Sequence, residues 1–163
     1  NALVETMKDN PTLVIELGSH TDFRGSASYN RNLAQRRAQS AVNYLISKGI
    51  TKDRMIAKGY GEDAPKELDS AYVQKAFFGD GEKGPTASNY STTTKRGKRV
   101  SASFEDQKNT FAVGMKLDET TINALQSEGL EECAHQMNRR TEFKVLRTDY
   151  KPGETAQGPG ENK

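Results

Sequence analysis

The chain has 163 residues, of which 33% are apolar and 28% are charged, and its 24 basic and 22 acidic residues leave a formal net charge of +2. This length suffices for one domain with an ordinary core, although the low apolar content implies that part of the chain stays solvated. The balanced charge argues against a nucleic-acid-binding protein, and the aromatic content of 7%, without tryptophan, argues against a base-stacking surface.

Cysteine content and hydropathy exclude two further features. A single cysteine, Cys133, rules out an internal disulfide bond. No apolar run is long enough to cross a bilayer as a helix. The sequence opens with NALVETMKDN, in the middle of an expected helix, so we expect it to be a piece of a longer chain.

Short apolar patterns predict the first elements. Apolar residues at helical spacing predict the end of an amphipathic helix over Ala2–Met7, which the pair Asn10-Pro11 terminates. The segment Leu13–Leu17, LVIEL, predicts a buried strand. The segment Gly18–Ser28 is rich in glycine and serine, and it predicts a loop.

A long helix and a second strand follow. Apolar residues at intervals of three and four predict a helix from about Tyr29 to Lys48, ended by Gly49. The segment Arg54–Tyr60 predicts a strand. A strand–helix–strand unit implies a parallel pair with a right-handed crossover, and ligands on such sheets bind beyond the carboxyl ends of the strands.

Two opposite charges lie near that edge. Asp22 comes just after the first strand, and Arg37 lies two turns into the helix, from which a long side chain can reach back. A carboxylate that binds an ammonium group and a guanidinium that binds a carboxylate can together hold a small zwitterion. Two simpler interpretations stay open. Asp22 can cap a turn, and Arg37 can be a surface arginine, although its spacing from Leu33 and Ala41 places it near the core-facing side.

The middle of the chain has a different character. The polar, turn-rich segment from Lys66 to about Asn109 predicts a long, partly mobile excursion. Alternating apolar residues on either side of EDQKN predict a β-hairpin with strands near 100–104 and 111–117. We favour a hairpin packed against the domain, and a surface for docking a partner is the alternative.

The last third of the chain contains two further elements. A helical pattern starts at Asp118, although Gly129 weakens it. The segment Thr141–Arg147, TEFKVLR, alternates apolar and polar residues and predicts a half-exposed final strand. The segment Tyr150–Lys163 is rich in proline and glycine and predicts disorder.

Residue types suited to catalysis or metal binding are sparse. His20 stands alone at a strand end, without a second ligand at suitable spacing. Cys133 and His135 are two residues apart on an expected helix, so they point to different faces. Neither a phosphate-binding loop nor a serine elbow is present. We therefore predict no catalytic residue, no metal and no cofactor.

One ordered set of motifs runs through the chain and closely resembles the OmpA-like (OmpA/MotB/Pal) peptidoglycan-binding domain. Its parts are His20-Thr21-Asp22, Gly25, Asn30, Leu33–Ala38 (LAQRRA), Tyr44-Leu45, Gly49-Ile50, Arg54, Gly59–Glu62 (GYGE), Pro65 and Asn138–Arg140 (NRR). The match covers Asn10–Pro65 and Asn138–Leu146. Each part alone is common, and the specificity lies in their order and spacing.

This resemblance implies an α+β fold, a two-layer βαβαβ-type sandwich with a mixed sheet and helices on one face. To this fold the chain adds a long insertion with a β-hairpin. We expect one domain over residues 1–150 with the insertion at 66–117, followed by a disordered tail at 151–163. The family domain normally begins with a strand before its first helix, and this sequence starts inside or after that helix.

The resemblance further implies non-covalent binding of peptidoglycan, through the meso-diaminopimelate of the stem peptide, without enzymatic activity. By this likeness Asp22 binds the ammonium group of diaminopimelate and Arg37 binds its carboxylate. The other residues that line the family's pocket correspond to Thr21, Asn30, Leu33, Asn138 and one of Arg139 or Arg140. Lysine lacks the extra carboxylate, so a lysine-type stem would leave Arg37 without its ligand.

The expected place of such a domain is the periplasm, where it anchors an outer-membrane or periplasmic assembly to the cell wall. Its expected partners are peptidoglycan and other envelope or secretion-system proteins, with no nucleic acid and no membrane span in this chain. The long insertion resembles Bacteroidetes versions, including the peptidoglycan anchor of type IX secretion (PorE-like). A protein–protein scaffold that uses residues 66–117 is the alternative function, and a cell-wall hydrolase that uses His20 and Asp22 is less favoured.

Overall fold

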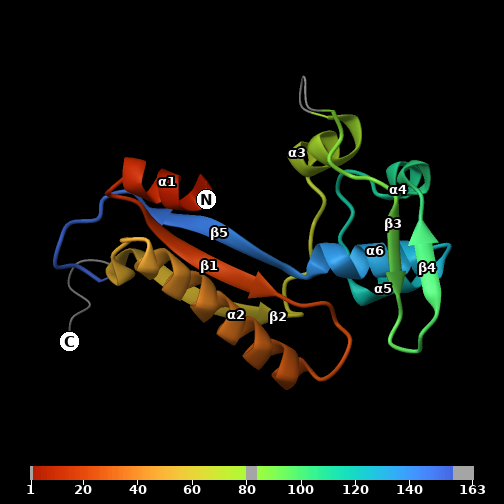
Figure 1. Ribbon diagram of the computed structural model, residues 1–163, viewed down its shortest axis with the longest axis horizontal. Coiled ribbons are helices and arrows are strands. Elements are labelled where there is room, and N and C mark those ends of the chain that lie inside the picture. The colour runs from red at the N-terminus through yellow and green to blue at the C-terminus, as the bar shows by residue number, and fades with distance from the viewer. Residues whose placement is uncertain (1, 80–83, 156–163) are drawn as a thin grey trace. The chain divides into compact units, whose positions relative to one another are not determined.

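The computed structural model of the protein describes residues 2–79 and 84–155, so the end of the expected tail, 156–163, lies outside the described residues. The chain divides into two compact units (Figure 1). The first unit joins Asn1–Asp63 to Arg140–Lys163, and the second unit is Ala64–Arg139. The expected insertion at 66–117 falls inside the second unit, which continues beyond it.

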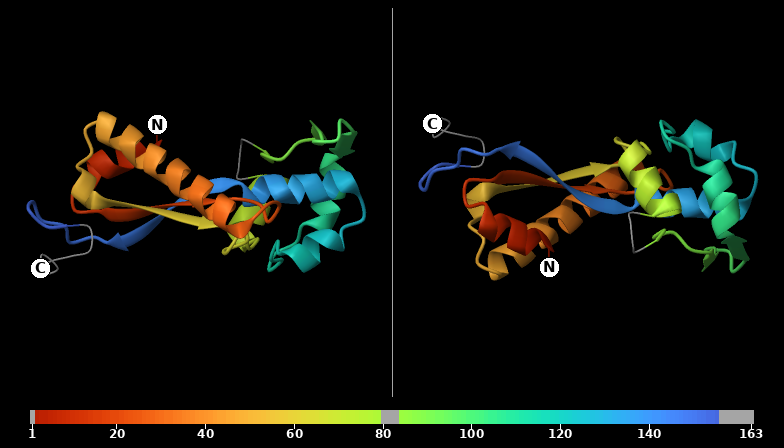
Figure 2. Two further views of the ribbon diagram at one scale, coloured as in Figure 1. Left: turned by 90° about the horizontal axis from the view of Figure 1, so that it is seen from below. Right: turned by 90° about the horizontal axis from the view of Figure 1, so that it is seen from above.

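A three-stranded sheet and two main helices make up the first unit. Its elements in chain order are α1 (Ala2–Asp9), β1 (Val14–His20), α2 (Ala27–Ser47), the 3-10 helix η1 (Lys52–Arg54), β2 (Met55–Gly61) and β5 (Arg140–Arg147). The strand order is β2-β1-β5, with β1 parallel to β2 and antiparallel to β5. Figure 2 shows α1 and α2 on one face of this sheet. The predicted α+β fold with a mixed sheet is confirmed.

Strand β1 is longer than the sequence pattern predicts. The sequence pattern predicts a loop from Gly18, whereas the structure continues the strand through His20. The reason is pairing on both sides, because His20 is in register with Gly61 of β2 and with Arg140 of β5. Backbone hydrogen bonds to two neighbouring strands outweigh the turn preference of glycine and serine.

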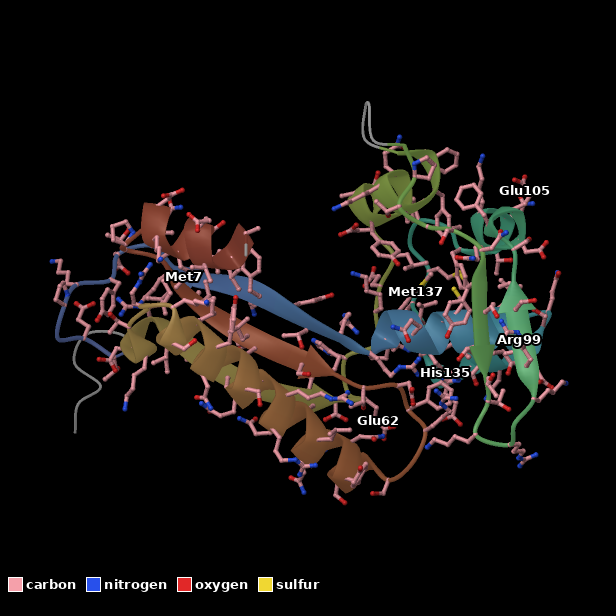
Figure 3. The ribbon with its side chains drawn as sticks, viewed as in Figure 1. Met7, Glu62, Arg99, Glu105, His135 and Met137 are labelled. Atoms are coloured by element: carbon pink, nitrogen blue, oxygen red, sulfur yellow. The ribbon has the colours of Figure 1, made fainter. Side chains whose placement is uncertain are left out.

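The core of the first unit lies between the sheet and the two helices. Ile15 and Leu17 lie on one face of β1, and Met7 of α1 is fully buried and points toward the strands (Figure 3). The buried apolar cluster consists of Val4, Met7, Leu13, Ile15, Leu17, Val42, Leu45, Ile50 and Met55. On the other face of the sheet, Val14 packs with Tyr150, which follows β5.

Helix α2 approaches β2 closely at Gly59. The Gln35 side chain accepts a hydrogen bond from the Gly59 N–H at 2.8 Å and donates one to the Ala57 carbonyl at 3.2 Å. A Cβ atom on Gly59 would lie 2.3 Å from the backbone nitrogen of Gln35. Only glycine therefore permits this contact between helix and strand.

A buried arginine connects α1 to the start of β2. The Arg54 guanidinium donates hydrogen bonds to the carbonyls of Met7 at 2.9 Å and of Leu13 at 3.0 Å, and to that of Asn10. Met7 and Asn10 belong to the end of α1 and the turn that follows it, where carbonyls lack intrahelical partners. Arg54 is 7% exposed, so these carbonyls have little access to water.

Removing the Arg54 side chain tests how much these hydrogen bonds, which cap the end of α1 and the turn after it, contribute to stability. We expect Arg54→Ala to lower the free energy of unfolding by about 2–4 kcal/mol, because it leaves three carbonyls without their cationic donor. Urea denaturation followed by circular dichroism measures the change. The control is Arg31→Ala, which removes an exposed ion pair with Asp63 and should cost less than about 1 kcal/mol. Equal losses in both variants would contradict a capping role.

The second unit consists of short regular elements rather than a mainly irregular excursion. They are α3 (Ser70–Val73), the π-helix η2 (Gln74–Phe78), β3 (Tyr90–Thr93), β4 (Arg99–Ala102), α4 (Phe104–Thr110), α5 (Glu119–Asn123) and α6 (Glu128–Asn138). Strands β3 and β4 form an antiparallel hairpin. Phe77 and Phe111 are buried together, with ring centroids 6.4 Å apart.

The hairpin exists, but its predicted position is wrong. The sequence pattern predicts strands near 100–104 and 111–117, on either side of EDQKN. In the structure, EDQKN belongs to helix α4. Ser103 caps this helix by accepting a hydrogen bond from the Asp106 N–H at 3.0 Å, and two acidic residues occupy the first turn. The true partner of β4 lies before it in the sequence, across the turn at 94–98.

The single helix predicted from Asp118 is two helices in the structure. Asp118 caps α5 and Ser127 caps α6, each accepting from a backbone N–H three residues later. Gly129 lies in the first turn of α6, where an added Cβ would meet the Ser101 carbonyl oxygen at 1.7 Å. The glycine that weakens the helical pattern is therefore needed for α6 to pack on β4.

Candidate functional site

Asp22 lies at the carboxyl end of the central strand. Strand β1 ends at His20, and the Thr21 N–H then donates a hydrogen bond to the Gly61 carbonyl at 2.8 Å. Thr21 and Asp22 are each 7% exposed. The sequence prediction that Asp22 follows the strand edge is confirmed, and its carboxylate is largely removed from water.

Arg24 pairs with Asp22, and the sequence analysis did not single out this arginine. The Arg24 backbone N–H and Nε both donate to Asp22 Oδ1, at 3.0 and 3.2 Å, and Nη2 donates to Oδ2 at 2.9 Å. The Asp22 side chain is 10% exposed and that of Arg24 is 39% exposed. The sequence does contain a signal for this pairing, because an acidic residue is followed two residues later by a basic one within a loop.

Asn30 holds the loop that carries these two residues. Its Nδ2 donates to the Asp22 carbonyl at 3.3 Å and to the Arg24 carbonyl at 2.9 Å. Asn30 is buried on α2, which begins after the capping residue Ser26. Gly25 has a φ of +91°, a conformation that favours glycine, and it lets the chain turn toward the helix.

Thr21 contributes a hydroxyl group that lacks a hydrogen-bond partner among residues 2–79 and 84–155. Its Oγ1 is buried, and no described residue donates to it or accepts from it. A buried hydroxyl without a partner costs free energy, which a polar ligand group can recover.

The expected position of Arg37 near the core-facing side of α2 is wrong. Ala34 and Ala38 form the buried stripe, while Arg37 is exposed and Leu33, one turn before it, is half-buried. Helical geometry places Leu33 and Arg37 on the same face, at i and i+4. An exposed guanidinium beside a half-buried leucine is accessible to a ligand.

The three residues of the NRR segment are divided between the units. Asn138 is 2% exposed in the second unit, where Oδ1 accepts from the Lys66 N–H at 2.8 Å and Nδ2 donates to the Leu117 carbonyl at 2.9 Å. Arg139, also in the second unit, donates to Gln136 Oε1 at 2.6 Å. Asn138 thus holds the fold of its own unit.

Arg140 begins strand β5 in the first unit. It is in register with His20, so it lies at the end of the sheet from which the chain continues to Asp22. Its Nε donates to Glu142 Oε1 at 2.6 Å. Of the three residues, Arg140 is the one that the first unit's own geometry brings to this edge.

His20 has a structural environment. Its ring stacks on Tyr60, with centroids 4.8 Å apart and planes inclined by 4°. The Tyr60 hydroxyl donates to the Glu16 carboxylate, and Lys58 Nζ lies 4.7 Å from the centroid of the Tyr60 ring. The hydrogen bond to Glu16, together with burial, raises the pKa of Tyr60 to about 12.

The Tyr60 hydroxyl should therefore ionise late. Its folded-state pKa lies above the ordinary value of 10, so the stabilisation is present below pH 10 and is lost as the pH rises through about 12. In a spectrophotometric tyrosine titration, we expect Tyr60→Phe to remove a step near pH 12. The control Tyr29→Phe, at a position that is 60% exposed, should keep that step. Burial also raises the pKa of Tyr72, so the deciding result is the amplitude of the step near pH 12. An unchanged amplitude in Tyr60→Phe would contradict the assignment.

Two further properties concern the part of the chain that the structure describes. No group of three or more histidine, cysteine, aspartate or glutamate side chains there could hold a metal ion. No described helix combines the length and the apolarity that a membrane crossing requires.

Cys133 is buried, and burial raises the pKa of its thiol to about 11, which keeps it unreactive at neutral pH.

Part of the chain is similar in sequence to proteins of one known family. The family model described as OmpA family matches residues 1–78. Outer membrane protein A of Escherichia fergusonii is 56% identical over 52 residues, which are 32% of this chain and 21% of that protein. Outer membrane protein A of Salmonella typhi is 54% identical over 52 residues, again 32% of this chain and 15% of that protein. The matched stretch thus spans about a fifth or less of these curated relatives.

Among solved structures, the peptidoglycan-associated lipoprotein from Burkholderia pseudomallei is similar at 30% sequence identity, with a TM-score of 0.39. The similarity covers 44% of this chain and 62% of that one. The narrower resemblance to type IX secretion anchors stays a prediction.

Proposed function

The chain carries an OmpA-like domain, and on that premise we propose that its first unit binds peptidoglycan non-covalently and anchors an envelope assembly to the cell wall. The observation that carries the proposal is the buried carboxylate of Asp22, two residues beyond the carboxyl end of β1. Parallel α/β units bind their ligands at such an edge.

The ligand we propose is the diaminopimelate of the stem peptide. Its ammonium group pairs with the Asp22 carboxylate, and its carboxylate pairs with the exposed Arg37 guanidinium. Each charge-assisted hydrogen bond contributes about 1.5–3 kcal/mol. Two opposite charges recognised together distinguish diaminopimelate from lysine, which lacks the second carboxylate.

Other residues support this pair in different ways. The buried Thr21 hydroxyl gains a partner from the ligand, Leu33 forms an apolar wall, and Asn30 fixes the loop. We favour Arg140 over Arg139 as the second cation, because its register places it at the correct end of the sheet. Asn138 supports the fold of the second unit, and its role in binding stays a prediction.

The activity we propose is binding without chemistry. His20 stacks on the Tyr60 ring, and Asp22 is paired with the Arg24 guanidinium. A domain of this kind serves at the periplasmic side of the outer membrane, consistent with the outer membrane protein relatives.

Co-sedimentation with purified sacculi tests the proposal. We expect the wild-type chain to pellet with diaminopimelate-type sacculi and not with lysine-type sacculi. Asp22→Ala and Arg37→Ala should each lower the bound fraction about tenfold or more, because each removes one charge-assisted contact.

Two matched controls accompany these variants. Arg36→Ala removes a neighbouring exposed arginine of α2, and Asp63→Ala removes an exposed carboxylate of the same unit. Both should pellet as the wild type does. If a folded wild type fails to pellet, or if the controls lose as much binding as Asp22→Ala, the proposal is wrong.

A second candidate function is suggested by the β3–β4 hairpin. Four of the five residues from Lys95 to Arg99 are basic, and all five are exposed; Figure 3 shows Arg99 on β4. The turn is fixed by the Gly97 and Thr94 N–H groups, which donate to the carbonyls of Thr94 and Lys98, both at 2.8 Å. A rigid basic tip is suited to an acidic protein surface.

The hairpin is tested with poly-L-glutamate as an acidic probe, by fluorescence anisotropy at low salt. We expect replacement of Lys95 and Arg96 by serine to weaken binding about tenfold, since two of the four tip charges disappear. Replacing Lys75 and Lys116 by serine provides the control with the same change of net charge. Equal effects of the two double variants would contradict a local docking surface.

A further inference from the structure

The loop after β1 contains an arginine, Arg24, that pairs with the carboxylate of the candidate site. Arg24 donates to both oxygens of the Asp22 carboxylate, so its guanidinium occupies the positions that an ammonium group of a ligand would take. The two side chains are only two residues apart, which makes this pairing intramolecular and local. A ligand that uses Asp22 must therefore displace Arg24 or approach beside a like charge.

Displacement is feasible for this arginine. Its side chain is 39% exposed, so the guanidinium can move into water, whereas the Asp22 side chain is only 10% exposed and stays in place. The carboxylate also keeps the hydrogen bond from the Arg24 backbone N–H, at 3.0 Å, whatever the side chain does. Asn30 continues to hold the loop through two carbonyls.

We propose that Arg24 is an internal competitor that determines the affinity and selectivity of the site for its ligand. The inference rests on the proposed function, because it concerns the same carboxylate. Without ligand, Arg24 neutralises a largely buried charge, which would otherwise be costly. A ligand replaces it only if a second contact, between the ligand carboxylate and Arg37, adds to the ammonium contact.

Selectivity follows from this competition. A simple amine offers Asp22 one cation in exchange for another and gains little by displacing a bidentate guanidinium. A zwitterion gains the additional contact with Arg37. Arg24 thus excludes ligands that present an ammonium group alone.

Isothermal titration of the full chain with meso-diaminopimelate tests this role. We expect Arg24→Ala and Arg24→Gln to bind about three- to tenfold more tightly than the wild type, because the competing cation is absent. In an Asp22→Ala background, the same Arg24 substitutions should leave the affinity for meso-diaminopimelate unchanged. The control Arg31→Ala removes another arginine ion pair, with Asp63, and should leave the affinity unchanged.

A merely structural role of Arg24 predicts a different pattern. In that case both variants bind more weakly than the wild type, or equally, while the wild type still binds, and this result would overturn the competitor role without affecting the proposed function. Absence of binding by the folded wild type and by the folded Arg24 variants would overturn both. Arg24→Gln keeps a polar side chain and serves if Arg24→Ala does not fold.

Discussion

Strand β1 occupies the centre of the three-stranded sheet. It is hydrogen-bonded on both sides, to β2 in parallel and to β5 in the antiparallel sense, and both of its faces are covered. Ile15 and Leu17 pack under the helices, and Val14 packs with Tyr150 on the opposite face. Because a central strand cannot slip without moving every neighbour, its end fixes the position of Asp22.

The second unit interrupts the sequence of the first without interrupting its sheet. The chain leaves the first unit after β2 and returns as β5, whose register against β1 runs from Arg147 to Arg140. The second unit has its own buried residues, with Phe77 and Phe111 among the most buried, and its own capped helices. An insertion with its own core costs the host sheet little, since loop closure depends only weakly on length.

The candidate site combines a fixed carboxylate with movable cations. Asp22 is held by the strand and by Asn30, whereas Arg24 and Arg37 lie at the surface on flexible side chains. Low exposure makes an uncompensated charge on this carboxylate costly, so a positive partner stabilises it. The identity of that partner, a residue of the chain or a ligand, is then a competition between cations, and this competition connects the fold to the proposed binding of the cell wall.

Local patterns predict the order of elements in the first unit, the position of Asp22 after a strand and the family motif, because hydrophobic periodicity and turn chemistry are properties of short segments. They predict a hairpin in the insertion but misplace it, since the cap at Ser103 competes with an alternating pattern. Three outcomes could not be predicted in this way: β1 continues to His20, Arg24 pairs with Asp22, and Arg37 is exposed. These outcomes depend on strand pairing and on side-chain packing between distant segments, which local patterns do not contain.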